Sequence, residues 1–432
     1  MVRRLLLLAV CFVAVAAAPA GAQGPTRLTL TAALEEALAH NFDVLRAQEK
    51  LAQLEGRVQE VKSRVYPQLG LESSYRRVYD ESILDTLEGF IPPEVRPNYS
   101  LRATANQLLF SWGKVSTAIE IARDSLTQGE LELDSARRQV KLDVHEAFYD
   151  LLLARRLVEV AEQTLAQRER QLDVARKRFE AGVVNEFEVI RARVDVANAT
   201  TPVIQARNRV RQARDRLNNL LARPQGSPLE PEGRLEYRPL EALTLDEVVD
   251  RAVRRRPELS ALRVGREIAR KNLKIARAED KLEVNLTAEY GYSAEKFEDL
   301  NANRERWVAA VVMSLPLFDG WRTRGRVAQA SSQVRDAEIA VRQLAEAVAL
   351  EAKAALDGLR EAEEIIRATR LTTGQAEKAL ELAEASYQYG VATFLDVTDA
   401  QLGLAVAQRD HAQALRDYMV AKARVLAVMN EL

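Results

Sequence analysis

The sequence predicts a mainly α-helical chain that carries a membrane β-barrel portion and is built as an internal duplication. Three observations support this fold class. Two very long helical patterns each turn back at a glycine, two pairs of segments with alternating polarity precede them, and these features recur in the same order in both halves. Each half therefore runs from a helix through a β-hairpin into a long helical hairpin.

Residues 1–22 have the features of a secretory signal peptide. Arg3 and Arg4 precede an apolar run from Leu5 to Ala18, and small residues lead to a cleavage site after Ala22. The run is too short to span a membrane as a helix. Cys11, the one cysteine, lies inside this run after Val10, which argues against a lipid anchor. Removal of the signal leaves no cysteine, so stability must come from packing or assembly.

The composition excludes several classes of function. Lys and Arg number 62 against 63 Asp and Glu, and this balance gives no indication of nucleic-acid binding. The three histidines stand far apart in the sequence, and neither metal-ligand spacing nor a nucleophilic triad nor a phosphate-binding loop is present. We therefore expect no enzymatic activity, no cofactor and no bound metal.

Residues 23–66 form the N-terminal helical segment of the first repeat. An apolar stripe at helical spacing runs from Leu34 to Val61, with Thr31 as the expected N-cap, and Pro67 ends the pattern. Residues 244–281 are the equivalent helical segment of the second repeat, and Leu243-Thr244-Leu245 there matches Leu28-Thr29-Leu30.

Residues 67–110 and 282–318 are expected to form two β-hairpins. Leu69 and Leu71 alternate with polar residues, as do Leu282, Val284 and Leu286, and each segment is about ten residues long. Such segments are typical of outer-membrane barrel strands, although an ordinary antiparallel sheet with one wet face shows the same alternation. The aromatic residues at the strand ends fit an interfacial girdle: Tyr75, Tyr99, Tyr292 and Trp307.

Four such strands cannot close a barrel by themselves, because single-chain barrels begin at about eight strands. An open sheet edge is not tolerated in lipid. If the strands cross a membrane, several chains must therefore share one barrel.

Residues 111–222 and 319–432 are the long helical hairpins, and a Pro/Gly linker at 223–243 joins the two repeats in an equatorial region. Pro202 is expected to kink or disturb the returning arm of the first hairpin. At the tips Gly182 aligns with Gly390, and a glycine just past a helix end provides the left-handed cap of a tight turn.

The order of these motifs resembles the TolC-like outer membrane efflux protein family over essentially the whole mature chain. The resemblance rests on the duplication, on Leu28-Thr29-Leu30, on the stretch Leu315 to Gly320, and on the tip from Tyr387 to Val397. It implies a homotrimer in which each chain gives four strands to a twelve-stranded barrel in outer-membrane lipid and helices to a periplasmic tunnel. It also implies a passive exit duct in the outer membrane of an efflux or type I secretion system, working with a periplasmic adaptor and an inner-membrane pump.

The resemblance also implies roles for residues at the tips. Asp396, Asp399 and Glu188 match acidic gate residues, and Tyr387 matches the aromatic member of the links that close the gate. The basic residue expected after the second glycine is absent, since Ala392 stands there. Exposed residues beside the turns are expected to dock the adaptor: Gly182, Val183, Gly390 and Val391.

Simpler interpretations remain beside these. Asp396 and Asp399 share one helix face near its N-terminus, where carboxylates commonly serve only to cap. In a trimer they would form a ring that attracts cations, with crowding that raises some of their pKa values. The glycines make the turns whether or not an adaptor docks there. The alternatives for the whole chain are a periplasmic adaptor and a soluble periplasmic coiled-coil scaffold.

Overall fold

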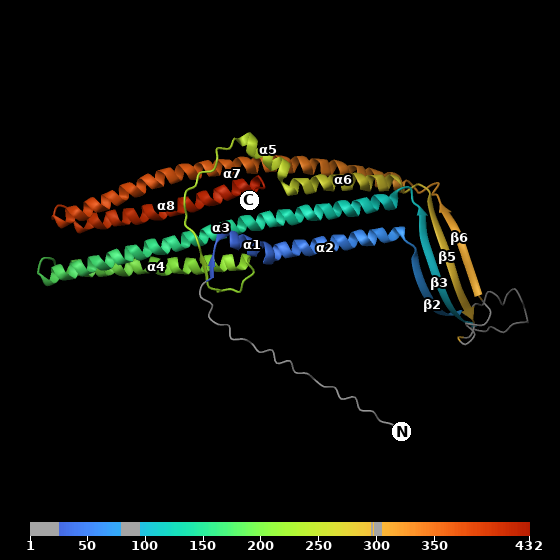
Figure 1. The fold of residues 1–432 in the computed structure, drawn as a ribbon, viewed down its shortest axis with the longest axis horizontal. Helices are drawn as coiled ribbons and strands as arrows, with labels where there is room; N and C mark the ends of the chain where they lie inside the picture. The colour runs from blue at the N-terminus through green and yellow to red at the C-terminus, as the bar shows by residue number, and fades with distance from the viewer. Residues whose placement is uncertain (1–25, 79–95, 295–296, 298–304) are drawn as a thin grey trace, which may run out of the picture.

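The computed structural model describes residues 26–78, 96–294, 297 and 305–432. The predicted signal peptide at 1–22 lies outside them. Long helices run along one axis, and a four-stranded sheet lies at one end of the molecule, turned away from that axis (Figure 1). The predicted fold class, mainly α with a four-stranded β portion, is confirmed.

The elements follow one another in the same order in the two halves, apart from a short extra helical turn. The first half consists of β1 (Thr26–Leu28), α1 (Leu30–His40), α2 (Phe42–Lys62), a 3₁₀ turn (Ser63–Val65), β2 (Gln68–Val78), β3 (Arg96–Phe110), α3 (Lys114–Glu180) and α4 (Glu186–Leu220). The second consists of β4 (Leu229–Pro231), α5 (Leu245–Arg255), α6 (Pro257–Arg277), β5 (Glu283–Ala294), β6 (Glu305–Ser314), α7 (Arg322–Gln388) and α8 (Phe394–Val428).

The first helical segment differs from the prediction in two ways. It is broken into α1 and α2 at Asn41, whose side chain donates to the carbonyl of Leu220 at 2.9 Å and accepts from the backbone of Asp43 at 2.9 Å. A side chain that caps a new helix and also bonds a distant chain segment favours a break there. The N-cap of α1 is Thr29, which accepts from Ala32, so the prediction of Thr31 was wrong.

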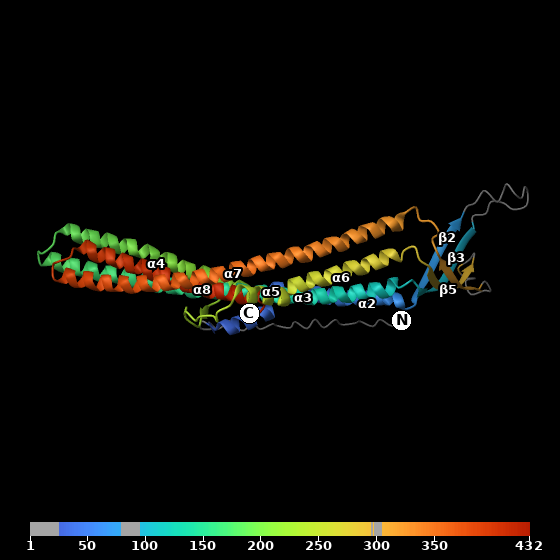
Figure 2. The ribbon, with the colours of Figure 1, turned by 90° about the horizontal axis from the view of Figure 1, so that it is seen from above.

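The long helices set the length of the molecule. Helices α3 and α7 have 67 residues each, so each is about 100 Å long. Helix α4 pairs with α3 and α8 with α7, while α3 also packs against α8 and so joins the two hairpins (Figure 2). Helix α4 continues through Pro202 without a break in its helical assignment.

The apolar core forms two large clusters near the middle of the helices. The first joins α1, α3 and the end of α4 around the fully buried Val144, Leu151 and Leu217. The second joins α5, α7 and α8 around Val348 and Tyr418. Burial of apolar side chains therefore fixes the hairpins at mid-height, and smaller clusters continue toward both ends.

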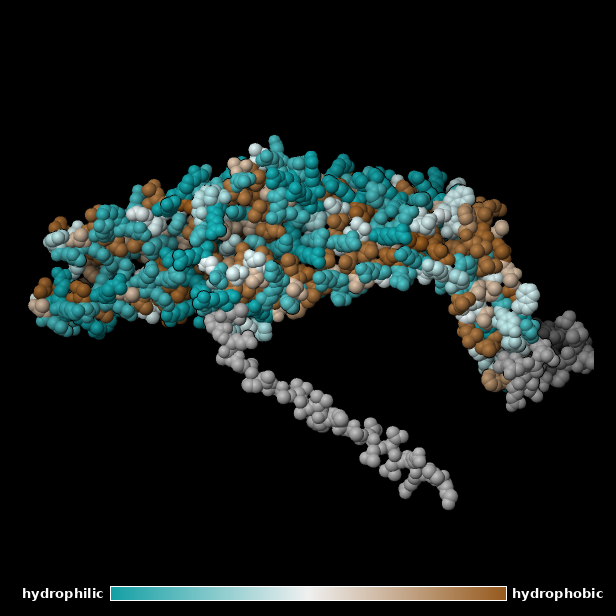
Figure 3. Space-filling model, viewed as in Figure 1, coloured by the Kyte–Doolittle hydropathy of each residue, from teal (hydrophilic) through white to brown (hydrophobic). Residues whose placement is uncertain are grey.

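The four-stranded sheet has the order β2-β3-β5-β6 and is antiparallel throughout. Its register places the alternating apolar residues on one face, where Leu69, Leu71 and Met313 are strongly exposed. The opposite face carries Arg102 and Glu289, which form a salt bridge at 3.3 Å. The surface over the sheet is correspondingly more hydrophobic than the middle of the helical bundle (Figure 3).

A small second sheet lies at mid-height. Here β1 pairs in parallel with β4, so that Leu28 lies opposite Pro231. The Pro/Gly linker therefore contains a short strand that returns to the start of the described chain. Among the described residues, no helix has both the length and the apolar character needed to cross a membrane.

Candidate functional site: the helical tips

Both hairpins turn by the same hydrogen-bonded motif. At the end of α3, Gly182 has φ 71° and donates to the carbonyl of Phe179, while Val183 donates to the carbonyl of Arg178. At the end of α7, Gly390 has φ 78° and occupies the equivalent position. These paired bonds satisfy the last carbonyls of each helix, and the left-handed backbone favours glycine. The tips are therefore well-defined turns of the same type.

The helices that leave the turns begin at side-chain caps. Asn185 accepts from the backbone of Glu188 at 3.2 Å at the start of α4. At the start of α8, Thr393 accepts from the backbone of Asp396 at 3.3 Å, and the Asp396 carboxylate accepts from both the backbone and the hydroxyl of Thr393 at 2.7 Å. This reciprocal arrangement is a capping box.

The cap determines the acidity of Asp396. Hydrogen bonds from the Thr393 hydroxyl and backbone stabilise the ionised carboxylate and hold the pKa of Asp396 below its usual value. In one chain the cap alone acts on this carboxylate, and the effect of crowding in a trimeric ring stays a prediction. Asp396 performs the capping role that the simpler interpretation assigned to it, and its carboxylate stays ionised to lower pH.

Three contacts join the two hairpins near the tips. The Arg178 guanidinium of α3 donates to the Tyr387 hydroxyl of α7, with its central carbon 5.2 Å from the centre of the tyrosine ring. One turn or more further from the tip, Gln171 donates to the side chain of Gln401 at 2.7 Å. Arg191 of α4 lies over the ring of Phe394, 6.0 Å from its centre. These polar and cation–π contacts connect the tips directly.

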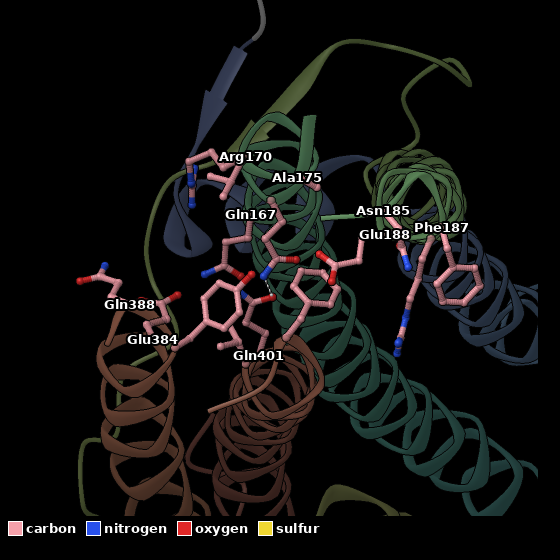
Figure 4. A pocket seen from close by; sticks show the side chains of 15 residues that line it. Gln167, Arg170, Ala175, Asn185, Phe187, Glu188, Glu384, Gln388 and Gln401 are labelled. Atoms are coloured by element: carbon pink, nitrogen blue, oxygen red, sulfur yellow. Dashed lines mark hydrogen bonds between the residues drawn. The ribbon is translucent and has the colours of Figure 1, made fainter. Parts of the chain in front are cut away.

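A cleft of about 410 Å³ lies between the two hairpins at these contacts. Glu188 comes from the first hairpin and Glu384 from the second, and Figure 4 shows both among the side chains that line it. Tyr387 and Phe394 supply aromatic walls. No lysine or arginine nitrogen lies within 4.0 Å of either carboxylate among the described residues.

The residues predicted for the gate lie in two places. Glu188 and Tyr387 both line the cleft. Asp396 and Asp399 are exposed and do not contribute to its lining. The residues predicted to dock the adaptor lie at the turns themselves, where the side chains of Val183 and Val391 are 64% and 83% exposed.

Arg178, Gln171 and Gln401 were missed by sequence reasoning. Gln401 is almost fully buried although it is polar, and Gln171 is half-buried. In the sequence, the only indication of such a contact is a polar residue among the apolar positions of a helix, and this does not show which residue it contacts. The partners are more than 200 residues apart in the sequence, so the contacts depend on how the hairpins pack.

The aromatic residues predicted for the girdle lie on the apolar face, in the part of the sheet farthest from the helices. Tyr75 and Tyr99 are direct partners with ring centres 4.8 Å apart. Tyr292 bonds the hydroxyl of Tyr290, whose partner on the next strand is Trp307. The register therefore places the four predicted aromatics close together in one band.

Across the part of the chain that the structure describes, no group of three or more His, Cys, Asp or Glu side chains could hold a metal ion. His145 bonds the carbonyl of Lys141 on its own helix at 2.8 Å, whereas His411 of α8 bonds the hydroxyl of Thr369 on α7 at 3.1 Å.

Comparison with known proteins identifies what the chain is similar to. The sequence model of the family described as "Outer membrane efflux protein" matches residues 33–223 and 248–431. The cobalt-zinc-cadmium resistance protein CzcC of Cupriavidus metallidurans is 27% identical, covering 89% of this chain and 85% of the relative. The outer membrane protein TolC of Escherichia coli is 23% identical, covering 87% and 77%.

A solved structure of an outer membrane protein has a similar fold. The crystal structure of the outer membrane protein VceC of Vibrio cholerae superposes with a TM-score of 0.77 at 21% sequence identity. The match covers 93% of this chain and 95% of that one, so the likeness extends over nearly the whole fold.

Proposed function

The chain belongs to the outer membrane efflux protein family, and from this premise we propose that three copies form one gated exit duct. It is an outer-membrane channel of an efflux or secretion system that extends into the periplasm. Channels of this family act as trimers with a periplasmic adaptor and an inner-membrane pump. The family assignment removes the two alternatives raised from the sequence, an adaptor and a soluble scaffold.

One observation carries the proposal for the barrel. The four-stranded sheet has an exposed apolar face, and among the described residues its outer strands β2 and β6 each pair on one side only. An apolar face suits lipid, while open edges do not. Pairing β2 of one copy with β6 of the next removes every edge, and three copies close a barrel of the size found in outer membranes. The aromatic band would then lie at a membrane interface.

The tips would form the periplasmic gate. In a trimer, Asp396 and Asp399 bring six carboxylates around one axis, which favours cations and opposes anions. The contact between Arg178 and Tyr387 holds the two hairpins of each copy together beside the Glu188 cleft. The exposed Val183 and Val391 beside Gly182 and Gly390 offer apolar area to an adaptor. Conduction through a channel needs no catalytic residues, so we expect no catalytic activity.

Single-channel conductance in a planar bilayer tests the gate. The double variant Asp396→Ala/Asp399→Ala is expected to show a larger conductance or a weaker block by Mg²⁺ than the wild type, because the acidic ring is lost. The control is Asp410→Ala, which removes one carboxylate from an exposed position on α8 away from the tip. An unchanged conductance and unchanged block in the double variant would exclude these residues from the gate.

A further inference from the structure

Another cavity, of about 370 Å³, is lined by residues of α3, α4 and β4. These elements meet at mid-height of the molecule (Figure 1). It is distant from the tips and from the four-stranded sheet. Its floor is apolar, made of Leu151, Val158, Val210 and Leu229. Its charged side chains are four arginines and two glutamates, namely Arg155, Arg207, Arg211, Arg214, Glu159 and Glu230.

The pairing of these charges leaves an excess of cations. Arg207 is bound to Glu162 at 2.7 Å, and Glu159 is bound to Arg156 at 2.7 Å. Among the described residues no carboxylate lies within 4.0 Å of Arg155, Arg211 or Arg214. Glu230 is the one remaining acid in the cavity against these three guanidinium groups.

Among the described residues, the three arginines make few hydrogen bonds to protein atoms. Arg155 donates to the carbonyl of Pro231 at a long 3.4 Å, and Arg211 donates to the side chain of Asn208 at 3.0 Å. The Nε of Arg214 is buried and has no hydrogen-bond partner in the part of the chain that the structure describes. A buried donor without an acceptor is unfavourable, so an acceptor that fills the cavity would relieve it.

We propose that this cavity binds a small oxyanion with at least two negative charges, of the phosphate or polycarboxylate class. Planar guanidinium groups match the geometry of carboxylate and phosphate oxygens and can bind them through two parallel hydrogen bonds. The apolar floor lowers the local dielectric and strengthens these charge interactions. Since Arg155 belongs to α3, Arg211 and Arg214 to α4, and Pro231 to β4, the anion would tie the linker between the repeats to the first hairpin.

Isothermal titration of the detergent-solubilised full-length protein tests the site at pH 7 and constant ionic strength. Inorganic phosphate and citrate are the two probes, and they distinguish a phosphate site from a polycarboxylate site. The wild type is expected to bind one of them saturably, at one site per chain. Arg211→Gln/Arg214→Gln is expected to weaken binding at least about ten-fold, a loss typical of removing charge-assisted hydrogen bonds.

The control is Arg209→Gln, which removes one guanidinium charge from an exposed position of α4 that does not line the cavity. It is expected to bind like the wild type, and Arg155→Gln serves as a second test variant if the double variant does not fold. If the wild type binds neither probe saturably, the proposal is wrong. The same result is expected if a neighbouring copy fills the cavity with its own carboxylates. Equal binding by a folded test variant overturns it as well.

Discussion

Glu258, the second residue of α6, connects the two repeats at mid-height. Its carboxylate accepts from the Ser135 hydroxyl at 2.7 Å and from the nearly buried guanidinium of Arg138, both on α3. Burial by itself would raise the pKa of Glu258, but the hydrogen bonds from Ser135, its own backbone and Arg138 outweigh it and leave the pKa below the usual 4.5. Beside it, Arg256 bonds Glu351 of α7 at 3.0 Å.

Replacing Glu258 with Ala should therefore destabilise the protein by roughly 3 kcal/mol at pH 7, because Arg138 is left buried without its partner. A carboxylate whose folded-state pKa is depressed stabilises above its unfolded pKa and loses that contribution as the pH falls through the folded value. The difference in melting temperature between wild type and variant should thus shrink below about pH 4.5.

Glu267→Ala is the control for this prediction, since Glu267 lies on the same helix in exposed pairs with Arg266 and Arg270. Its effect should stay within about 0.5 kcal/mol. A difference between Glu258→Ala and the wild type that is the same at pH 7 and at pH 3 would contradict the assignment.

Residues that act within their own helix could be predicted from sequence, whereas residues that act across the fold could not. Gly182 and Gly390 follow from local backbone requirements, and the acidic residue three positions after Thr393 follows from capping chemistry. The contacts of Tyr387 with Arg178 and of Gln401 with Gln171 depend on hairpin packing. No local pattern encodes these pairs.

At the scale of elements, strand β5 has a requirement for glycine that the alternation pattern does not reveal. A Cβ added to Gly291 would lie 2.5 Å from the carbonyl oxygen of Leu101 on β3, and backbone atoms cannot move aside as a side chain can. The close approach of the two strands therefore depends on the missing side chain.

Gly291→Ala is expected to destabilise the sheet by about 1–3 kcal/mol, the range for overpacking. The loss can be measured as a lower unfolding temperature in the strand signal of circular dichroism. Gly70→Ala is the control, because its added Cβ meets only the Thr104 hydroxyl at 3.0 Å, and it should cost less. Equal stability of Gly291→Ala and the wild type would mean that β3 and β5 are not so closely paired.

Long elements were predictable, while short or interrupted ones were not. A long run of helix-forming residues predicts a helix, and polarity that alternates every second residue predicts a strand. Both patterns are clear when they extend over ten residues or more. The three-residue strands β1 and β4 are paired across about 200 residues of sequence and carry no such signal. The break between α1 and α2 likewise depends on the bond from Asn41 to the carbonyl of Leu220, which exists only in the folded chain.

At the scale of the whole molecule, an apolar sheet with two open edges lies at one end of the elongated fold. Two helical tips, joined by polar side-chain contacts, lie at the other end. The described chain is not a closed structure in lipid, since β2 and β6 lack a second partner strand. The four alternating segments in the sequence already predict that one chain cannot close a barrel. Four strands show only that further strands are needed to close a barrel, and they do not determine how many chains supply them. The number of three copies is what the resemblance to the family implies.

Native mass spectrometry of protein extracted from membranes in detergent is the most direct test of a barrel shared between copies. We expect a species with three times the mass of one mature chain, and no stable species without detergent. A stable monomer that stays in solution without detergent, with the four strands folded, would contradict it.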